Sequence, residues 1–318
     1  MNSIVVFSGS AHTELAKAIG RRLKTRLSPS TTSRFSNDCL GVQLGANCRE
    51  ADVFLIQPLV PPVQEHLMEL LLMLDAARGA SAARITAVIP HFAYARSDKK
   101  DAPRISIAAR LVADLLSTAG ANRVLTMTLH SPQVHGFFSV PVDHMTALEV
   151  LAAHFRRGKL TNTVIVSPDL GNAKEASHLA RLLKLPVAAG SKKRLSDDRV
   201  VIDAIVGHVE GKNVIVLDDE IANGGTIVEI LERLREFRVK RIVVACTHGL
   251  FTGKAIDRLR AQSDVSEIVT TDTVPVPTGK RLPNMTVLSV APLLAEAIRR
   301  IHVGQSVSGL FDSAAAAR

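Results

Sequence analysis

Aromatic residues are scarce in this 318-residue chain, which has one Tyr, no Trp and 10 Phe, so that aromatics make up only 3% of its residues. Proteins that bind single-stranded nucleic acid stack successive bases on aromatic rings, and this scarcity argues against a nucleic-acid partner. Hydrophobic residues nevertheless make up 47% of the chain. We therefore expect cores built mainly from aliphatic side chains.

Long apolar runs and paired cysteines are missing as well. No run approaches the roughly 18 apolar residues that indicate a membrane-spanning helix, and the N-terminus lacks the pattern of a secretory signal peptide. The three cysteines, Cys39, Cys48 and Cys246, show no CxxC spacing, which indicates neither a zinc site nor a disulfide framework. We predict a cytoplasmic protein with no membrane partner.

The formal net charge is +9, from 39 Lys and Arg against 30 Asp and Glu. The basic residues occur in short groups among acids, and there is no long basic tail. Because phosphates are bound by Lys and Arg side chains, small polyanionic substrates would account for this surplus.

Short apolar runs alternate with helical patterns along both halves of the chain, which predicts two α/β domains with mostly parallel central sheets. We place them at residues 1–147 and 148–318. Apolar runs predict strands at 84–90 and 123–129, among others. The Ser/Thr-rich residues 28–36 and the basic residues 190–194 predict loops.

The rest of the chain is organised around residues 213–237, NVIVLDDEIANGGTIVEILERLREF. A buried strand is predicted at 214–217, followed by an acidic turn at Asp218 and Asp219 and a helix that begins near Thr226. The free N–H groups of a glycine loop at a helix N-terminus favour an anion such as a 5′-phosphate, and the two carboxylates could accept hydrogen bonds from ribose hydroxyls. An ordinary strand-to-helix turn with solvated acids remains the alternative.

The segment LDDEIANGGT resembles the phosphoribosyl-diphosphate loop of the type I phosphoribosyltransferase fold, although Ala222 stands where a third acid is expected and Asn223 where the first Thr is expected. Further segments occur in the order typical of the ribose-phosphate diphosphokinase family: FSGSAHTELAKAI, RFSND, RITAVIPHFAYARSDKK, TLHSPQVHGFFSVPVDH, SPDLGNA and LLAEAIRRI followed by SVSGLF. The resemblance covers essentially the whole chain.

The resemblance implies two phosphoribosyltransferase-like (type I) domains, each with a mostly parallel central sheet flanked by helices. It also implies the reaction, in which the C1 hydroxyl of ribose 5-phosphate attacks the β-phosphorus of ATP and AMP leaves. Mg²⁺ is the expected cofactor because phosphate oxygens and carboxylates suit it. The family further implies a homo-oligomer, hexameric or dimer-based, whose subunits share the ATP site.

Residue roles follow from the matched positions. His130 and Asp169 correspond to the metal-site His and Asp, and His130 also counts among the catalytic residues with Lys192 and Arg194 of the basic segment. That segment is also suited to a mobile lid. The ribose 5-phosphate site is predicted to comprise Asp218, Asp219, Asn223, Gly224, Gly225 and Thr226.

The ATP site implied by the resemblance comprises Phe35, Asn37, Arg96, Ser97 and Lys99. Phe35 would stack on the adenine of a neighbouring subunit's site, although the sequence alone would equally allow it to be a core residue.

Departures from the family pattern lie around the expected substrates, at Asn37, Cys39, Ser97, Thr128 and Ala222. A lost hydrogen bond to a charged group costs roughly 1.5–3 kcal/mol, which is damaging without abolishing activity. Two alternatives to a diphosphokinase therefore stay open: a non-catalytic subunit that regulates a partner, and a phosphoribosyltransferase that uses the same loop.

Overall fold

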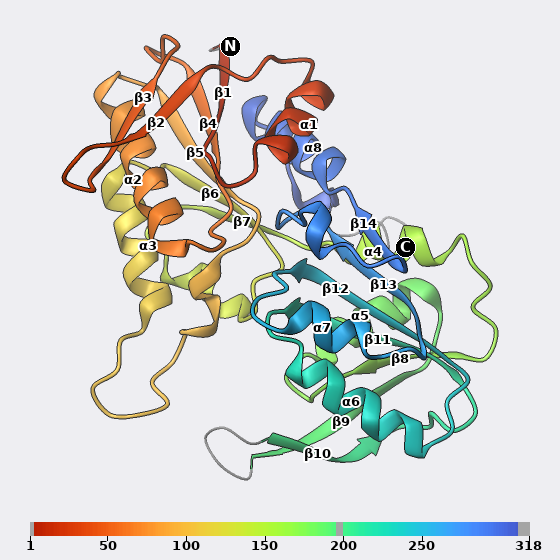
Figure 1. Ribbon diagram of the computed structural model, residues 1–318. Coiled ribbons are helices and arrows are strands. Elements are labelled where there is room, and N and C mark those ends of the chain that lie inside the picture. The colour runs from red at the N-terminus through yellow and green to blue at the C-terminus, as the bar shows by residue number, and fades with distance from the viewer. Residues whose placement is uncertain (1–2, 195–199, 311–318) are drawn as a thin grey trace. The chain divides into compact units, whose positions relative to one another are not determined.

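The computed structural model describes residues 3–194 and 200–310 of the chain. The chain forms two compact units, the first from residues up to Thr146 together with those from Val290 onward, and the second from Ala147–Ser289. Both are α/β units with parallel sheets flanked by helices (Figure 1), as predicted. Within the described ranges, no helix is both long enough and apolar enough to cross a membrane.

The first unit is built on a five-stranded parallel sheet in the order β1-β4-β5-β6-β7. Its strands are β1 (Ile4–Ser8), β4 (Asp52–Ile56), β5 (Arg84–Ile89), β6 (Arg123–Met127) and β7 (Val142–Met145). Its helices are α1 (Thr13–Leu23), α2 (Val63–Gly79), α3 (Ala108–Ala119) and α8 (Ala291–His302). In Figure 1, α2 and α3 lie on one side of the sheet and α1 and α8 on the other. This arrangement leaves the strands buried on both faces, which is why they are nearly continuous apolar runs.

A separate antiparallel hairpin pairs β2 (Ser30–Arg34) with β3 (Leu40–Leu44). The prediction of a loop over residues 28–36 was therefore wrong. The β2 residues Thr31–Arg34 are exposed, so this strand lacks the apolar alternation by which a half-buried strand is recognised. Buried Glu69 of α2 accepts hydrogen bonds from the hydroxyls of Ser10 and Thr32 and from the Gln57 amide, and so attaches the hairpin to the first unit.

Helix α8 packs with the first unit, whereas the predicted division at residues 147 and 148 assigns it to the second domain. Arg84 pairs with the buried Asp52 and also donates to the Ile301 carbonyl at 2.9 Å. The His302 Nδ1 lies 2.8 Å from the Asp52 carboxylate. These contacts join residues more than 200 positions apart, and no local pattern indicates them.

The second unit is built on a seven-stranded sheet in the order β10-β9-β8-β11-β12-β13-β14, in which only β10 runs antiparallel to its neighbour. The strands are β8 (Thr163–Ser167), β9 (Val187–Arg194), β10 (Val200–Val206), β11 (Asn213–Ile221), β12 (Arg241–Gly249), β13 (Val265–Thr271) and β14 (Met285–Leu288). The helices are α4 (Leu148–Phe155), α5 (Ala173–Leu183), α6 (Gly225–Glu236) and α7 (Ala255–Arg260).

Alternate residues of β11 enter two different cores. Ile215 and Leu217 pack with the apolar residues of α4 and α5, while Val214 and Val216 pack with those of α6 and α7. Helices therefore cover both faces of the sheet, and the carboxyl end of β11 is held by packing on either side. This rigid central strand carries the acidic residues of the organising motif.

The basic residues at 190–194 continue β9 and do not form the predicted loop. Strand β9 pairs with β8 only over Val187–Ala189, and beyond that point it pairs with β10 alone, up to the pair Arg194 and Val200. The two strands thus extend past the sheet as a two-stranded ribbon, a structure that is marginally stable by itself. A charged segment at the edge of a sheet carries no apolar pattern, which explains the wrong prediction.

Candidate active site

The two aspartates of the motif lie within strand β11 and not in a turn after it. The predicted strand ended at Leu217, but pairing with β12 continues through Asp218 with Cys246 and Glu220 with His248. Asp219 lies between these pairs and is 8% exposed. Both carboxylates therefore belong to the carboxyl end of a central strand, where open α/β sheets bind their ligands.

Three successive carbonyl groups fix the loop that follows β11. Ile221 O accepts from Phe251 N at 3.0 Å and Ala222 O from Thr252 N at 2.8 Å, and both donors lie in the connection between β12 and α7. Asn223 O accepts from the guanidinium of Arg258, a residue of α7, at 2.8 Å. The loop is thereby anchored through three backbone acceptors.

The loop turns into α6 through Gly224, whose φ of +77° favours glycine. The Asn223 side chain accepts from the Gly225 N–H at 2.9 Å and so occupies one donor of the helix N-terminus. Within the described part of the chain, the Thr226 and Ile227 N–H groups and the Thr226 hydroxyl have no hydrogen-bond partner. Unpaired N–H groups at the start of a helix form an anion-binding site.

A carboxylate cluster lies beside this anion site. Burial, together with the nearby Asp219 and Asp169 carboxylates, raises the pKa of Asp218 well above its usual range. Asp169 belongs to the turn after β8, where its carboxylate accepts from the Asn172 N–H at 3.0 Å, and the Asn172 amide donates to Leu217 O at 3.0 Å. Mutual repulsion of carboxylates is relieved by a bound cation, so the donor set suits a hard metal ion.

Arg258 is a positioning residue that the sequence did not indicate. Because its guanidinium holds the Asn223 carbonyl, we expect Arg258→Ala to raise the KM for the predicted sugar-phosphate substrate about tenfold, which corresponds to one lost charge-assisted hydrogen bond. The value of kcat should change little, since the loop would still close around bound substrate. Steady-state kinetics test this, with Arg260→Ala as the control because Arg260 pairs with Asp257 instead. Equal KM values for the two variants would contradict the assignment.

In the first unit, the predicted strand at 123–129 ends at Met127, since Thr128 adopts a left-handed φ of +43° and turns the chain. The next N–H, of Leu129, donates to Nε2 of His144 on β7 at 2.9 Å. This bond fixes the backbone immediately before the exposed His130. His144 therefore positions the segment that carries the predicted metal and catalytic histidine.

His144 must be neutral to accept that hydrogen bond. Burial, with a smaller contribution from nearby His135, lowers its pKa from 6.5 to about 4. A histidine whose folded pKa is lowered contributes stability that is complete above pH 6.5 and is lost as the pH falls toward 4, because only the unfolded chain takes up the proton.

We expect protonation of His144 to lower the free energy of unfolding by about 3 kcal/mol between pH 7 and pH 4. Urea denaturation of wild type and His144→Gln at fixed protein concentration measures it, since glutamine keeps an acceptor but does not titrate. The variant should show the smaller pH dependence. Identical pH profiles for the two proteins would disprove the role.

Two predicted ATP-site residues lie in the turn between β2 and β3. Phe35 is 59% exposed, which excludes the core alternative for it. Its ring lies against Gly41, where a Cβ would come within 2.9 Å of the ring atoms. The Asn37 side-chain amide oxygen accepts from the Cys39 N–H at 3.3 Å within the turn. An exposed aromatic ring on a hairpin tip has the geometry for stacking on a ligand outside its own unit.

The other three predicted ATP-site residues, Arg96, Ser97 and Lys99, follow β5. Arg96 ends a short 3₁₀ helix (Ala93–Arg96) and is exposed, as is Lys99, which pairs with Asp101 at 3.5 Å. The Ser97 hydroxyl accepts from the Ala108 N–H at 3.2 Å and so caps α3. This is a structural role that the sequence did not suggest, and nucleotide binding by Ser97 stays a prediction.

The structure brings Asp169, Asp218, Asp219 and the glycine loop together at one edge of the second sheet. His130 and the five predicted ATP-site residues belong to the first unit. Lys192 and Arg194 lie on β9, opposite Ile202 and Val200 in register. Among the described residues, no group of three or more His, Cys, Asp or Glu side chains is placed to hold a metal by protein ligands alone.

Comparison with known proteins identifies two family models in the chain. Residues 4–120 match the N-terminal domain of ribose phosphate pyrophosphokinase, and residues 195–312 match the phosphoribosyl synthetase-associated domain. Together the two models cover most of the chain.

Similar full-length proteins carry the same description. A putative ribose-phosphate pyrophosphokinase of Streptomyces coelicolor is 64% identical over 98% of this chain and 99% of its own length. The ribose-phosphate pyrophosphokinase of Deinococcus radiodurans is 51% identical over 97% and 98%. A crystal structure of phosphoribosylpyrophosphate synthetase from Mycobacterium smegmatis superposes with a TM-score of 0.90 at 40% identity, covering 95% of this chain and all of that one.

Proposed function

The chain belongs to the ribose-phosphate pyrophosphokinase family and is an enzyme of diphosphoryl transfer. From this premise we propose which of its residues bind each substrate, which bind the metal ion and which stabilise the transferring group. The reaction moves the β,γ-diphosphoryl group of ATP to the C1 hydroxyl of ribose 5-phosphate, giving 5-phosphoribosyl 1-diphosphate and AMP. A bond forms between the C1 oxygen and the β-phosphorus, and the bond from that phosphorus to the α-phosphate oxygen breaks.

The observation that carries the assignment is the unpaired donor set at the start of α6. The Thr226 and Ile227 N–H groups and the Thr226 hydroxyl would bind the 5′-phosphate. Asp218 and Asp219 would accept hydrogen bonds from the ribose hydroxyls and orient the sugar. Holding the nucleophile in this way removes much of the entropic barrier to reaction.

Asp169 would supply a carboxylate ligand to Mg²⁺, with further ligands from oxygens of the substrates, and a metal-binding role for His130 stays a prediction. This ion usually retains several waters and takes only one or two carboxylates when it also binds phosphates, which suits a protein whose described residues supply no complete ligand set. When bound, it would neutralise charge that develops on the transferring phosphates. The raised pKa of Asp218 supports a cation next to this carboxylate cluster.

We propose that ATP is bound across subunits of a homo-oligomer. Arg96 and Lys99 would contact the nucleotide phosphates, and the exposed Phe35 ring would stack on the adenine of a neighbouring subunit's site. Lys192 and Arg194 on β9 would neutralise the transferring diphosphoryl group.

The test is product formation from ribose 5-phosphate and Mg²⁺ with ATP, GTP, CTP and UTP in parallel, with nucleoside monophosphate and phosphoribosyl diphosphate both quantified. We expect both products in equal amounts with ATP, and none when ribose 5-phosphate is omitted. The ranking of the four nucleotides measures how Asn37 and Cys39 affect base selection. Absence of both products from folded protein would overturn the proposal in favour of a regulatory subunit. Base-dependent consumption of phosphoribosyl diphosphate without ATP would favour a phosphoribosyltransferase.

A further inference from the structure

A cavity of about 310 Å³ lies at the amino ends of the central strands of the second sheet. The aspartates lie at the other end of these strands, toward the carboxyl end of β11. The cavity is lined by residues at or near the amino ends of β8, β11, β12 and β13 and by the segment that follows α4. Cavities of this size commonly hold small molecules. The proposed reaction uses none of its residues, because the substrates bind at the carboxyl end of β11.

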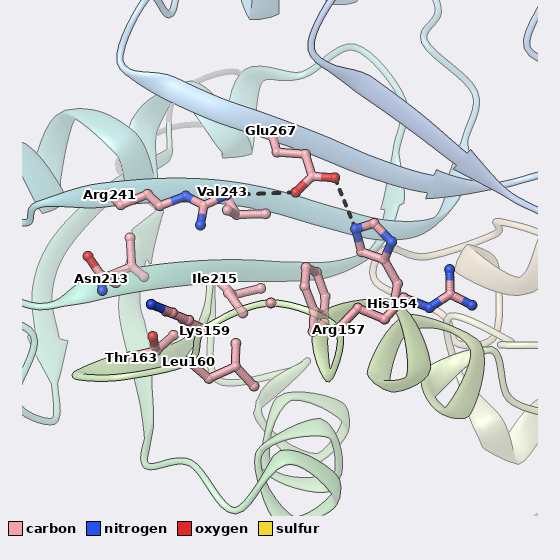
Figure 2. A pocket seen from close by; sticks show the side chains of 13 residues that line it. His154, Arg157, Lys159, Leu160, Thr163, Asn213, Ile215, Arg241, Val243 and Glu267 are labelled. Atoms are coloured by element: carbon pink, nitrogen blue, oxygen red, sulfur yellow. Dashed lines mark hydrogen bonds and ion pairs between the residues drawn. The ribbon is translucent and has the colours of Figure 1, made fainter.

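The cavity combines an apolar wall with cationic groups. Leu160, Ile215 and Val243 supply apolar side chains. In Figure 2, the Lys159 and Arg241 side chains lie on one side of the view, and His154 and Glu267 lie toward the other. A ligand that fills this space meets a nonpolar surface along its body and two cationic side chains at the end where Lys159 and Arg241 lie, while Arg157 lies on the side of His154.

Among the described residues, Glu267 is the only carboxylate that lines the cavity, and its charge is already compensated. Its oxygens meet His154 Nε2 at 2.9 Å, the Thr286 hydroxyl at 3.0 Å and the Arg241 guanidinium at 3.9 Å. Lys159 forms no ion pair with any described residue. The lining therefore carries surplus positive charge beside an apolar wall, a combination that favours an amphiphilic anion over a neutral molecule.

We propose that this cavity is a second ligand site, which binds an organic phosphate monoester through its dianionic group at Lys159 and Arg241 and through its apolar body at Ile215 and Val243. A phosphate monoester carries nearly two negative charges at neutral pH, which matches two cationic side chains better than a carboxylate does. The Arg241 Nε donates to the Ser266 hydroxyl at 3.0 Å, which fixes the guanidinium. Its Nη1 has no hydrogen bond or ion pair with any residue that the structure describes.

Phenyl phosphate is the probe, because it joins a phosphate dianion to a flat apolar body. The substrate sites would also attract it, so the full-length protein is first saturated with ribose 5-phosphate, Mg²⁺ and the non-cleavable analogue α,β-methylene-ATP. Binding is followed by NMR through the methyl resonance of Ile215, which lines the cavity. Inorganic phosphate and phenol serve as separate probes of the charged and apolar halves.

We expect phenyl phosphate to shift the Ile215 resonance saturably, and to bind at least tenfold more tightly than either inorganic phosphate or phenol. Lys159→Ala and Arg241→Ala should each weaken binding about tenfold, the effect of one lost charged contact. Lys240→Ala is the matched control, since Lys240 is an exposed neighbour of Arg241 that does not line the cavity, and it should bind as wild type does.

Three outcomes would overturn the proposal: no shift of Ile215, equal binding by the Lys159→Ala and Lys240→Ala variants, or equal binding of phenyl phosphate and inorganic phosphate. These outcomes leave the proposed catalytic function untouched, because the substrate sites are occupied throughout. Loss of enzymatic activity, conversely, would not alter the expected shift.

Discussion

Lys192→Ala is expected to lower kcat about 10³-fold while leaving the fold intact. Removing one preorganised donor from a developing negative charge typically costs 10²–10³ in rate, and a full cation lies at the upper end of that range. Lys192 lies on the part of β9 that pairs only with β10, beyond the body of the sheet. The substitution therefore removes charge from a ribbon that lies beyond the body of the sheet, and kcat should fall far more than the KM values change.

Lys193→Ala is the matched control, since it removes the same charge from the adjacent position of the same strand. Its kcat should stay within a few-fold of wild type, and circular dichroism should show that both variants keep native secondary structure. Wild-type turnover by the Lys192→Ala enzyme would show that Lys192 of β9 has no role in catalysis. An unfolded Lys192→Ala protein would show instead that the ribbon of β9 and β10 is required for stability.

Asp218→Asn should change activity and stability in opposite directions. The neutral amide is a weaker acceptor for ribose hydroxyls, so kcat/KM for ribose 5-phosphate is expected to fall about 100-fold, the upper end for a hydrogen bond to a charged group. The same change removes an ionisable group whose charged form is opposed by burial and by the nearby Asp219 and Asp169 carboxylates. Relief of that repulsion should raise the Tm of the protein without substrate by about 2–4 °C, which corresponds to roughly 1 kcal/mol.

Calorimetry without Mg²⁺ and initial-rate kinetics with it measure the two effects. The control is Glu232→Gln, which removes one negative charge from an exposed position on α6, the helix that follows the loop. It should leave both quantities unchanged. A lower Tm for Asp218→Asn would mean that the carboxylate stabilises the fold, and it would contradict the view that this residue is retained for substrate binding alone.

The alternation of strands and helices and the acidic glycine-rich motif were predictable from sequence because their signals are local. Asp218, Gly224 and Thr226 occur within nine residues of one another, and the structure places them in β11, in the loop after it and in the first turn of α6. The end of β11 was not predictable, since the apolar pattern stops at Leu217 while backbone pairing with β12 continues to Ile221. Ladder hydrogen bonds join backbone groups, and they do not require apolar side chains.

The residues that position the site were missed because their partners are distant in sequence. Arg258 lies 35 positions from the carbonyl that it holds, and His144 lies 15 positions from the N–H that it accepts. Neither belongs to a motif with a known spacing. At Ser97 the resemblance suggested a nucleotide contact, but it gave no indication that the Ser97 hydroxyl caps α3. A side chain's local partner depends on the loop's path, and a single sequence does not encode that path as a recognisable pattern.

The three cysteines differ in exposure, so a thiol-reactive label should attach to the native chain at one position. Cys48 and Cys246 are buried, and burial raises the pKa of the Cys246 thiol to about 12, whereas Cys39 is exposed. A maleimide fluorophore would thus attach at Cys39 without any engineered substitution, since reactivity requires an accessible thiolate. That position is two residues from Asn37 and four from Phe35. The dye would lie on the hairpin proposed to contact a neighbouring subunit's nucleotide, where its emission could follow assembly and ATP binding in the otherwise unaltered enzyme.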